Sequence, residues 1–303
     1  MPITRSDFPK DLEPGLNTHF GMEYRQRPEE WRVVYEVNGS QKAFEEDVLM
    51  TGFAGAAIVE EGDSVGYASA AQGWSARYQH DKVALAFAIT QEAVDDNLYF
   101  SLGPKYARAL ARALRHTKEI LHAAHFNNAF SSSYPIGDGV AWLSTAHPVT
   151  AGGTQSNKLA TAADLSEEAV EDLLIMIRKA KDDMGVPMAL MAKRVIIPPE
   201  LEYEACRIFQ SSLRVGTSDN DVSAIRNKGI FTSDPHVMTY LTDPDAWFIQ
   251  TDCPDGLKHF RRMPVKRGME GDFETGNMRY KAWERYSSGL TDWRCGYGSE
   301  GAA

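Results

Sequence analysis

The sequence LGPKYARALARALRHTKEILHAAHFNNAF, residues 102–130, predicts one long helix around which the rest of the chain is organised. Pro104 suits a first helical turn, where its missing N–H is not needed. Polar and apolar side chains each recur at spacings of three and four, which indicates an amphipathic helix. The expected polar face is Lys105, Arg108, Arg112, Arg115, Glu119 and His122, and the expected apolar face is Tyr106, Leu110, Ala113, Leu114, Thr117, Leu121 and Ala124.

The composition is that of an ordinary soluble globular protein. Of the 303 residues, 43% are hydrophobic and 24% charged, and no apolar run approaches the roughly 18 residues that a membrane span requires. Cys206, Cys253 and Cys295 are scattered, which is typical of reduced thiols rather than of a disulfide framework. The net charge of −10 argues against tight direct DNA binding. An acidic wall beside DNA is compatible with it, because repulsion prevents sticking.

Residues 1–50 predict an arm that lies across other surfaces. Proline and glycine interrupt any long element in it, at Pro9, Pro14, Gly15 and Pro28. The run Trp31–Val37 predicts one short strand. Phe20, Tyr24 and Trp31 favour docking over disorder, because disordered segments usually lack aromatic residues. A partly ordered terminus is the alternative.

Residues 51–90 predict a long hairpin of small residues. Its second strand alternates larger apolar residues with alanine over Val83–Ile89, which is the period of a strand. We place the tip at Ala70–Trp74, between two strand-like runs. Because a two-stranded ribbon with little side-chain volume is marginal in water, we expect it to rest on a neighbouring molecule. An internal sheet edge is the alternative.

A compact α/β region follows, and the last part of the chain is rich in strands. Ser166 is a candidate helix N-cap, Arg194–Ile197 a buried strand, and Pro198-Pro199 the start of a second helix. Further strands are predicted at Val237–Leu241, Ala246–Gln250, Leu257–Arg262 and Met278–Tyr286. The chain shows no internal repeat and no low-complexity tract.

Motifs of common enzyme families are absent from the sequence. There is no phosphate-binding loop, no dinucleotide-binding turn, no HExxH helix and no nucleophile elbow. The best metal candidate is the set Glu119, His122 and His125, spaced by three along one helix face. Di-metal sites in helix bundles need a second set of this kind, and the sequence has none.

Two further candidates have plainer interpretations. His147 lies near Ser144 without a paired acid in view, so a structural loop histidine is the better interpretation. Asp219-Asn220-Asp221 lacks the glycine and the distal glutamate of a calcium loop, so a solvated turn is expected. We therefore predict no catalytic residue, no cofactor and no metal.

The order of these segments resembles the major capsid proteins of tailed bacteriophages, the HK97-type family. The shared order is an arm, a small-residue hairpin, a long helix, a compact α/β lobe and returning strands. Three local runs support the resemblance: Leu143–Pro148 with Gly152-Gly153 and Asn157, Arg194–Pro199, and Tyr240–Ile249. No single run is specific, but their order covers nearly the whole chain. The resemblance implies an α+β, HK97-like fold and a structural protein rather than an enzyme.

The resemblance also implies a division of the chain and a set of contacts. It implies an N-terminal arm at 1–50, an E-loop hairpin at 51–90, a P-domain with its spine helix at 91–134, an A-domain at 135–235, and return strands of the P-domain at 236–303. Pentamers and hexamers would assemble into an icosahedral shell around double-stranded DNA. Intersubunit contacts are expected from the E-loop tip at Tyr67, Gln72, Gly73, Trp74 and Arg77, and from the arm at Phe20, Tyr24 and Trp31.

The main expected partner is the chain itself. Because the arm begins without a long helical segment, the resemblance implies a separate scaffolding protein or prior cleavage. It also implies a portal, room for a decoration protein, and packaged DNA bound without sequence specificity. No membrane partner is expected, and the protein belongs in the virion capsid, assembled in the host cytoplasm. The hairpin tip holds no lysine and Lys82 lies toward its base, so no covalent cross-link is predicted.

Two alternatives stay open at this point. One is the shell protein of an encapsulin-like nanocompartment, which shares the fold and encloses a cargo enzyme. The long E-loop favours the phage interpretation, and particle contents would decide. The other is a metal-dependent enzyme that uses Glu119, His122 and His125, which elemental analysis would test.

Overall fold

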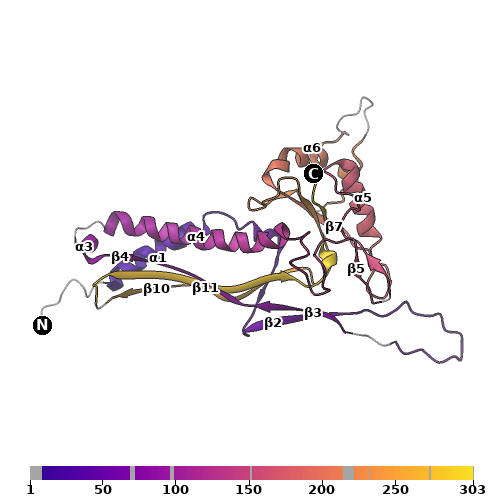
Figure 1. The fold of residues 1–303 in the computed structure, drawn as a ribbon, viewed down its shortest axis with the longest axis horizontal. Coiled ribbons are helices and arrows are strands. Elements are labelled where there is room, and N and C mark those ends of the chain that lie inside the picture. Colours follow the sequence, from indigo (N-terminus) through magenta and orange to yellow (C-terminus); the bar gives the residue numbers. More distant parts are fainter. Residues whose placement is uncertain are drawn as a thin grey trace.

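The computed structural model describes residues 9–68, 72–95, 99–150, 152–213, 222–231, 233–272 and 274–302. Figure 1 shows an elongated lobe along one long helix, a second lobe at one end of it, and a narrow segment that projects beyond both. The long helix is α4 (Tyr99–Asn127), which confirms the predicted helix with both ends three residues earlier. Two four-stranded sheets with helices of their own, and two smaller two-stranded sheets, make an α+β architecture.

The elongated lobe is a four-stranded sheet covered by helices on one face. The strand order is β1 (Glu36–Gly39), β10 (Leu257–Gly271), β11 (Met278–Leu290) and β4 (Asp81–Ile89). All pairs are antiparallel except β1 with β10. α4 and α1 (Pro9–Arg25) pack on the face that carries Tyr280 and Ala282, whose side chains are buried. Residues two apart on a strand share a face, so Lys281 and Trp283 lie on the opposite, uncovered side.

The N-terminal segment contains a helix where proline and glycine predicted none. α1 passes through Pro14, and its Leu16 and Phe20 are 2% and 1% exposed against α4. Burying this stripe outweighs the cost of about 3 kcal/mol that an internal proline imposes. The predicted strand Trp31–Val37 is also wrong at its start, because Trp31–Val34 form the short helix α2.

The buried face of α4 differs from the one that the sequence pattern predicted. Tyr106 and Leu121, expected on the apolar face, are 49% and 40% exposed, whereas Glu119 and His122, expected on the polar face, are 4% and 0% exposed. The buried residues of α4 are Ala107, Leu110, Ala111, Leu114, Lys118, Glu119, His122, Ala123 and Phe126. Polar side chains are buried here because they form hydrogen bonds and ion pairs with the N-terminal segment and the sheet. The periodicity of the helix sequence cannot predict such contacts with distant segments.

The second lobe is a four-stranded sheet with short helices around it. Its strand order is β12 (Gly296–Ser299), β9 (Trp247–Thr251), β7 (Ala192–Ile197) and β8 (His236–Val237). Its helices are α5 (Glu167–Arg178), the short turn η2 (Pro199–Leu201), α6 (Glu202–Gln210) and α7 (Ala224–Asn227). Ser166 caps α5 as predicted, because its hydroxyl accepts the Ala169 N–H at 3.2 Å. β8, β9 and β12 lie beyond the expected boundary at residue 235, so only β10 and β11 return to the elongated lobe.

The hairpin lies at other residues than those predicted. Its strands are β2 (Phe44–Met50) and β3 (Gln72–Gln79), which pair with each other. The alternating run is β4, which pairs with β11 and so is the internal sheet edge considered as the alternative. The residues between Met50 and the undescribed Ser69–Ala71 carry neither helix nor strand and run outward (Figure 1). The remaining elements are α3 (Gln91–Asp95), β5 (His147–Pro148), β6 (Thr154–Gln155) and η3 (Trp293–Cys295).

Candidate functional site

Residues 53–68, here called the projecting loop, extend away from both lobes (Figure 1). Every residue of this loop is exposed. Its large apolar side chains are Phe53, Ile58, Val59, Val65 and Tyr67, exposed by 60%, 99%, 43%, 74% and 103%. Apolar groups gathered on one narrow segment of a soluble chain mark a surface that binds a partner.

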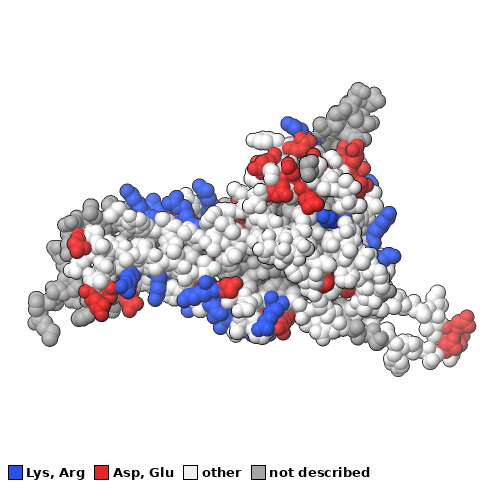
Figure 2. Space-filling model, in the orientation of Figure 1, with Lys and Arg blue, Asp and Glu red and all other residues white. Residues whose placement is uncertain are grey.

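The tip of the projecting loop is a turn that carries carboxylates. The Asp63 N–H donates to the Glu60 carbonyl at 3.1 Å, and Gly62 has φ +94°, a conformation that favours glycine. Glu60, Glu61 and Asp63 form the acidic end of the loop in Figure 2. The loop contains no lysine or arginine. It therefore presents apolar flanks and a negatively charged end.

The base of the hairpin is bonded to its own chain at the end of β11. The Trp74 indole N–H donates to the Thr291 carbonyl at 2.9 Å, and the Tyr78 hydroxyl lies 2.5 Å from Thr291 Oγ1. Lys258 Nζ lies 2.6 Å from a carboxylate oxygen of Asp47 on β2. Burial raises the pKa of Tyr78, so this hydroxyl stays protonated. These bonds fix the direction in which the projecting loop leaves the molecule.

Only Tyr67 among the five predicted hairpin-tip residues lies in the projecting loop. Gln72 and Gly73 begin β3, and Arg77 lies 3.9 Å over the Phe44 ring. Trp74 packs against the core of the second lobe, so its expected place at the tip is wrong. Ala70 and Ala71 of the expected tip lie outside the described residues.

A turn signal was available in the sequence but was not used. Glu60-Glu61-Gly62-Asp63 places glycine at the third turn position, where a positive φ is required. Gln72-Gly73 was interpreted as the tip instead. The intersubunit contact through Tyr67 stays a prediction, and the same role now falls on the apolar residues beside the true turn.

The aromatic residues of the arm lie against their own chain. Phe20 and Trp31 are 1% and 3% exposed, and Tyr24 is half-buried. The reason for assigning them to a neighbour, that they lack a partner within the chain, therefore does not hold. Their partners form a polar cluster between the arm, α4 and the sheet. We call it the junction cluster, and it consists of Tyr24, Trp31, Lys118, Glu119, His122, His259 and Glu284.

Three aromatic rings in close contact form one half of the junction cluster. The Trp31 ring centroid lies 4.4 Å from that of His122 and 4.3 Å from that of His259. His122 Nδ1 donates to the Lys118 carbonyl at 2.6 Å, so its Nε2 accepts from His259 Nδ1 at 2.9 Å. Burial lowers the pKa of His122 well below its usual value and that of His259 to about 3. Both rings are therefore neutral at pH 7.

Charged side chains form the other half. Lys118 Nζ lies 2.6 Å from a Glu284 carboxylate oxygen and donates to the Tyr24 hydroxyl at 2.7 Å. The Glu119 carboxylate accepts the Glu30 and Trp31 backbone N–H groups at 3.0 and 3.1 Å, which satisfies the start of α2. Burial raises the pKa of Glu119 to about 7, although these two bonds favour its charged form. The cluster holds the arm on the spine of its own chain.

These bonds also account for the suggested metal set. Glu119 bonds to backbone, His122 to His259, and His125 Nε2 lies 3.2 Å from Ser288 Oγ. Within the described residues, no group of three or more histidine, cysteine, aspartate or glutamate side chains is arranged to hold a metal ion. Cys206, Cys253 and Cys295 are free thiols. No helix in the described part of the chain has the length and apolar character to cross a membrane.

A second buried polar group lies at the base of the second lobe. His147 Nδ1 lies 2.6 Å from Asp138 Oδ2, and its Nε2 lies 3.0 Å from Asn157 Oδ1. The ring stacks on Trp293 with centroids 4.2 Å apart. Asp138 is the acid that sequence reasoning missed, because it lies in a separate loop. Ser144 Oγ accepts the Ala146 N–H and does not bond to His147, so the histidine ties loops together.

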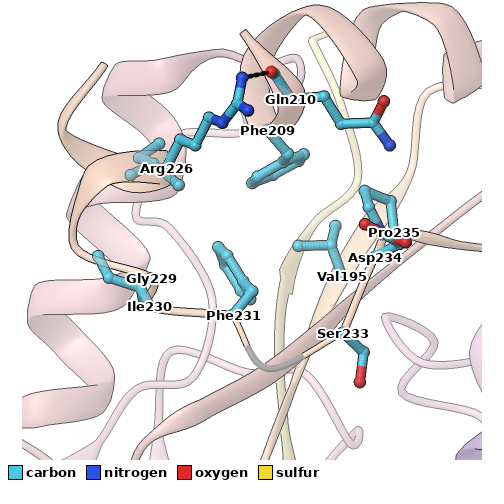
Figure 3. A pocket seen from close by; sticks show the side chains of 11 residues that line it. Val195, Phe209, Gln210, Arg226, Gly229, Ile230, Phe231, Ser233, Asp234 and Pro235 are labelled. Atoms are coloured by element: carbon cyan, nitrogen blue, oxygen red, sulfur yellow. Dashed lines mark hydrogen bonds between the residues drawn. The ribbon is translucent and has the colours of Figure 1, made fainter. Parts of the chain in front are cut away.

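The second lobe also has a pocket of about 570 Å³ between α6, α7 and β7 (Figure 3). Phe209 and Phe231 meet edge to face across it with centroids 5.2 Å apart. Arg226 at its rim donates to the Gln210 carbonyl. Its wall mixes apolar side chains with Gln210, Arg226, Ser233 and Asp234, and its lining brings together no pair of acids and no histidine. Asp219, Asn220 and Asp221 of the suggested calcium loop lie outside the described residues.

Comparison with known proteins gives one family match and several similar structures. The phage capsid protein family matches residues 75–299. The capsid of the cyanophage P-SCSP1u is similar at 12% identity and a TM-score of 0.57, covering 89% of this chain and 86% of that one. The capsid of an empty GTA particle is similar at 15% identity and a TM-score of 0.55, covering 91% of each chain. The procapsid of bacteriophage JBD30 is similar at 17% identity and a TM-score of 0.52, covering 99% of this chain and 77% of that one. No curated protein matches the sequence.

Proposed function

The chain belongs to the phage capsid protein family, and from this we propose that it assembles as hexamers and pentamers into an icosahedral shell around double-stranded DNA. It has the HK97-like capsid fold that the resemblance predicted. It is a structural protein of the capsid shell and not an enzyme. The proposal concerns the hexamers and pentamers, the enclosed DNA and the further partners of the shell.

The projecting loop is the observation that carries this proposal. A lone exposed apolar residue needs no explanation, but Ile58 and Tyr67 are fully exposed on a segment that touches neither lobe. Such a segment gains free energy only when another molecule covers it. Because the base of the hairpin is bonded at Trp74 and Asp47, the loop is presented in one direction.

Contacts of this kind generate rings. A loop of one copy that binds a different surface of the next copy is a head-to-tail contact, which closes into a ring when the rotation fits. Five or six copies around an axis then form the capsomers of the shell. The same contact repeated between rings would join capsomers to each other.

Further partners follow from the family and not from a site on this chain. We expect a scaffolding protein, a portal and a decoration protein to act with it, and assembly to take place in the host cytoplasm. Lys82 lies in β4 and is separated from the projecting loop by the whole of β3, so we still expect no lysine cross-link from the loop tip. The family match favours a DNA-filled capsid over a nanocompartment with a cargo enzyme.

Electron microscopy of the purified full-length chain tests the proposal. Wild-type protein should form closed shells, and the nucleic acid content of particles from infected cells should exceed their content of any second protein. The variant Ile58→Ser with Tyr67→Ser should stay folded and form no closed shells. Ala56→Ser with Ala57→Ser is the matched control in the same loop, since both alanines are exposed and small.

Two results would contradict the proposal. Normal shells from the Ile58 and Tyr67 variant would show that the loop does not carry assembly. Particles that hold a stoichiometric enzyme and no DNA would support the nanocompartment alternative instead.

A further inference from the structure

We propose that the solvent-facing side of α4 is a contact surface for duplex DNA and forms part of the inner wall of the shell. The surface consists of Lys105, Arg108, Arg112 and Arg115, here called the basic stripe. The inference rests on the proposed function, because only a shell that encloses DNA brings the two together. It names the face of the chain that meets the DNA.

The charged side chains of α4 that face the solvent are all basic. Glu119 is the single acidic residue between Tyr99 and Asn127, and it is 4% exposed and bonded to backbone N–H groups. Lys105, Arg108 and Arg112 are exposed and Arg115 is half-exposed. Figure 2 shows the resulting row of blue side chains above the elongated lobe. The surface of this helix is therefore cationic on a chain whose net charge is −10.

The spacing of the basic stripe suits a long, evenly charged partner. Its members are separated by three, four and three residues, so they lie along one side of the helix and span about 15 Å. Duplex DNA carries one negative charge per about 1.7 Å of its axis. A duplex that lies along α4 can therefore pair with all four cations at once.

Two bonds hold the stripe at the surface without neutralising it. Arg112 Nε lies 3.6 Å from Glu23, but the Arg112 side chain is 68% exposed. Arg115 donates to the Pro28 carbonyl at 3.0 Å, which orients the guanidinium and leaves its charge unpaired by that bond. Exposed arginines held in this way lose less conformational freedom when they bind phosphate.

The acidic excess of the chain lies elsewhere. Exposed Glu168, Glu171 and Asp172 on α5 make part of the second lobe acidic, and the projecting loop ends in carboxylates (Figure 2). Repulsion keeps DNA away from these parts. The net charge of −10, which argued against tight direct DNA binding, therefore does not describe the α4 surface.

The alternative partner for the basic stripe is the acidic tip of the projecting loop of another copy. Its three carboxylates lie within one four-residue turn, so they can meet only part of a stripe that spans about 15 Å. The duplex matches the full length of the stripe. We therefore assign the stripe to DNA and make loop binding an outcome of the test.

Binding of random-sequence duplex DNA to the full-length chain, purified before shell closure, is measured as a function of salt. The test variant is Lys105→Glu, Arg108→Glu and Arg112→Glu. The matched control is Lys82→Glu, Lys266→Glu and Lys281→Glu, which changes the charge equally on the uncovered face of the sheet. Losing three phosphate contacts should lower the slope of log K against log salt by about 2.7. The control should keep the wild-type slope, and cryo-electron microscopy of filled particles should show duplex density along α4.

Three outcomes would overturn the inference. One is an equal slope in the wild type and the test variant, and another is a control whose slope falls as much as that of the test variant. In the third, the test variant fails to form shells and regains them when Glu60, Glu61 and Asp63 are changed to lysine, which would assign the stripe to the loop. In each case wild-type shells that contain DNA would leave the proposed function standing.

Discussion

The arm and the projecting loop were expected to behave alike, and the structure separates them. Both were interpreted as segments without a resting place on their own molecule. The arm finds one, because Phe20 and Trp31 are buried and the junction cluster satisfies its polar groups. The projecting loop finds none within the described residues, and its apolar side chains stay exposed. Two segments with similar sequence signals therefore differ in the structure, because the arm packs on its own subunit and the loop stays exposed.

The chemistry of the two regions explains the difference. The arm carries large aromatic rings and a capped helix start, which supply apolar area and hydrogen bonds to α4. The loop carries small residues and glycine around a few isolated apolar side chains, so it has no surface broad enough to pack on its own lobes. This contrast predicts effects on subunit stability at the junction cluster and effects on assembly at the loop.

The largest effect is expected from splitting the buried ion pair of the junction cluster. Glu284→Leu leaves the buried Lys118 with only the more distant Glu29 carboxylate, 4.0 Å away, and removing the near partner of a buried ion pair costs about 3–5 kcal/mol. The double variant Lys118→Met with Glu284→Leu should lose much less, because no charge is left unpaired. Denaturant unfolding of assembly-blocked subunits measures both. Glu61→Leu in the loop is the control, with a change within about 0.5 kcal/mol.

A Glu284→Leu variant as stable as the wild type would contradict the difference between the arm and the projecting loop. The junction cluster would then not hold the arm, and the two regions would be equivalent after all.

A smaller effect is expected where the hairpin base meets the second lobe. Trp74→Ala removes a partly buried ring and its bond to Thr291, so we expect a loss of about 2–3 kcal/mol in unfolding free energy. Tyr67→Ala, seven residues earlier and fully exposed, should change it by less than about 0.5 kcal/mol. Equal effects of the two substitutions on stability would show that Trp74 belongs to the loop and not to the base.

The smallest effect is a dependence of stability on pH, to which the junction cluster contributes together with His125, whose pKa burial lowers to about 4. His259 has a folded-state pKa of about 3, below the unfolded value near 6.5, so between these values the unfolded chain binds the extra proton. Stability should therefore fall as the pH drops below 6.5, by about 2 kcal/mol from this group at pH 5. Glu119, with its pKa raised to about 7, acts in the opposite direction because burial of its charge is relieved on protonation.

Unfolding measured between pH 7 and pH 5 checks this prediction. Removing the opposing group in Glu119→Gln should steepen the loss of stability on acidification. A stability that rises as the pH falls in Glu119→Gln, where the opposing group is absent, would mean that His122 and His259 are charged in the folded subunit. The variant Ile58→Ser in the loop should leave the pH profile of unfolding unchanged, because this exposed side chain contacts none of the titrating groups of the cluster.

Much of the architecture was readable from local patterns. The period of residues 102–130 predicted α4, Ser166 with the acids after it predicted the start of α5, and Arg194–Ile197 predicted β7. These signals are local because capping and periodicity involve residues a few positions apart. The order of segments was also enough to indicate the capsid family, which the family match then confirmed.

Other features depended on contacts between distant parts of the chain. The sequence pattern placed Glu119 and His122 on a solvated or metal-binding helix face. Their partners in the structure are Trp31 and His259, which are far away in sequence. Asp138 was not connected with His147 because Asp138 lies in the loop after α4 and His147 in the strand β5.

By itself the sequence determined α4, the start of α5 and β7, since the interactions that decide these elements span single turns and neighbouring residues. Only the tertiary structure decided which face of α4 is buried, that β4 joins β11 while β3 pairs with β2, and that the arm docks while the loop projects. Each of these depends on whether a distant segment offers enough apolar area and enough hydrogen-bonding partners, and no local pattern records that.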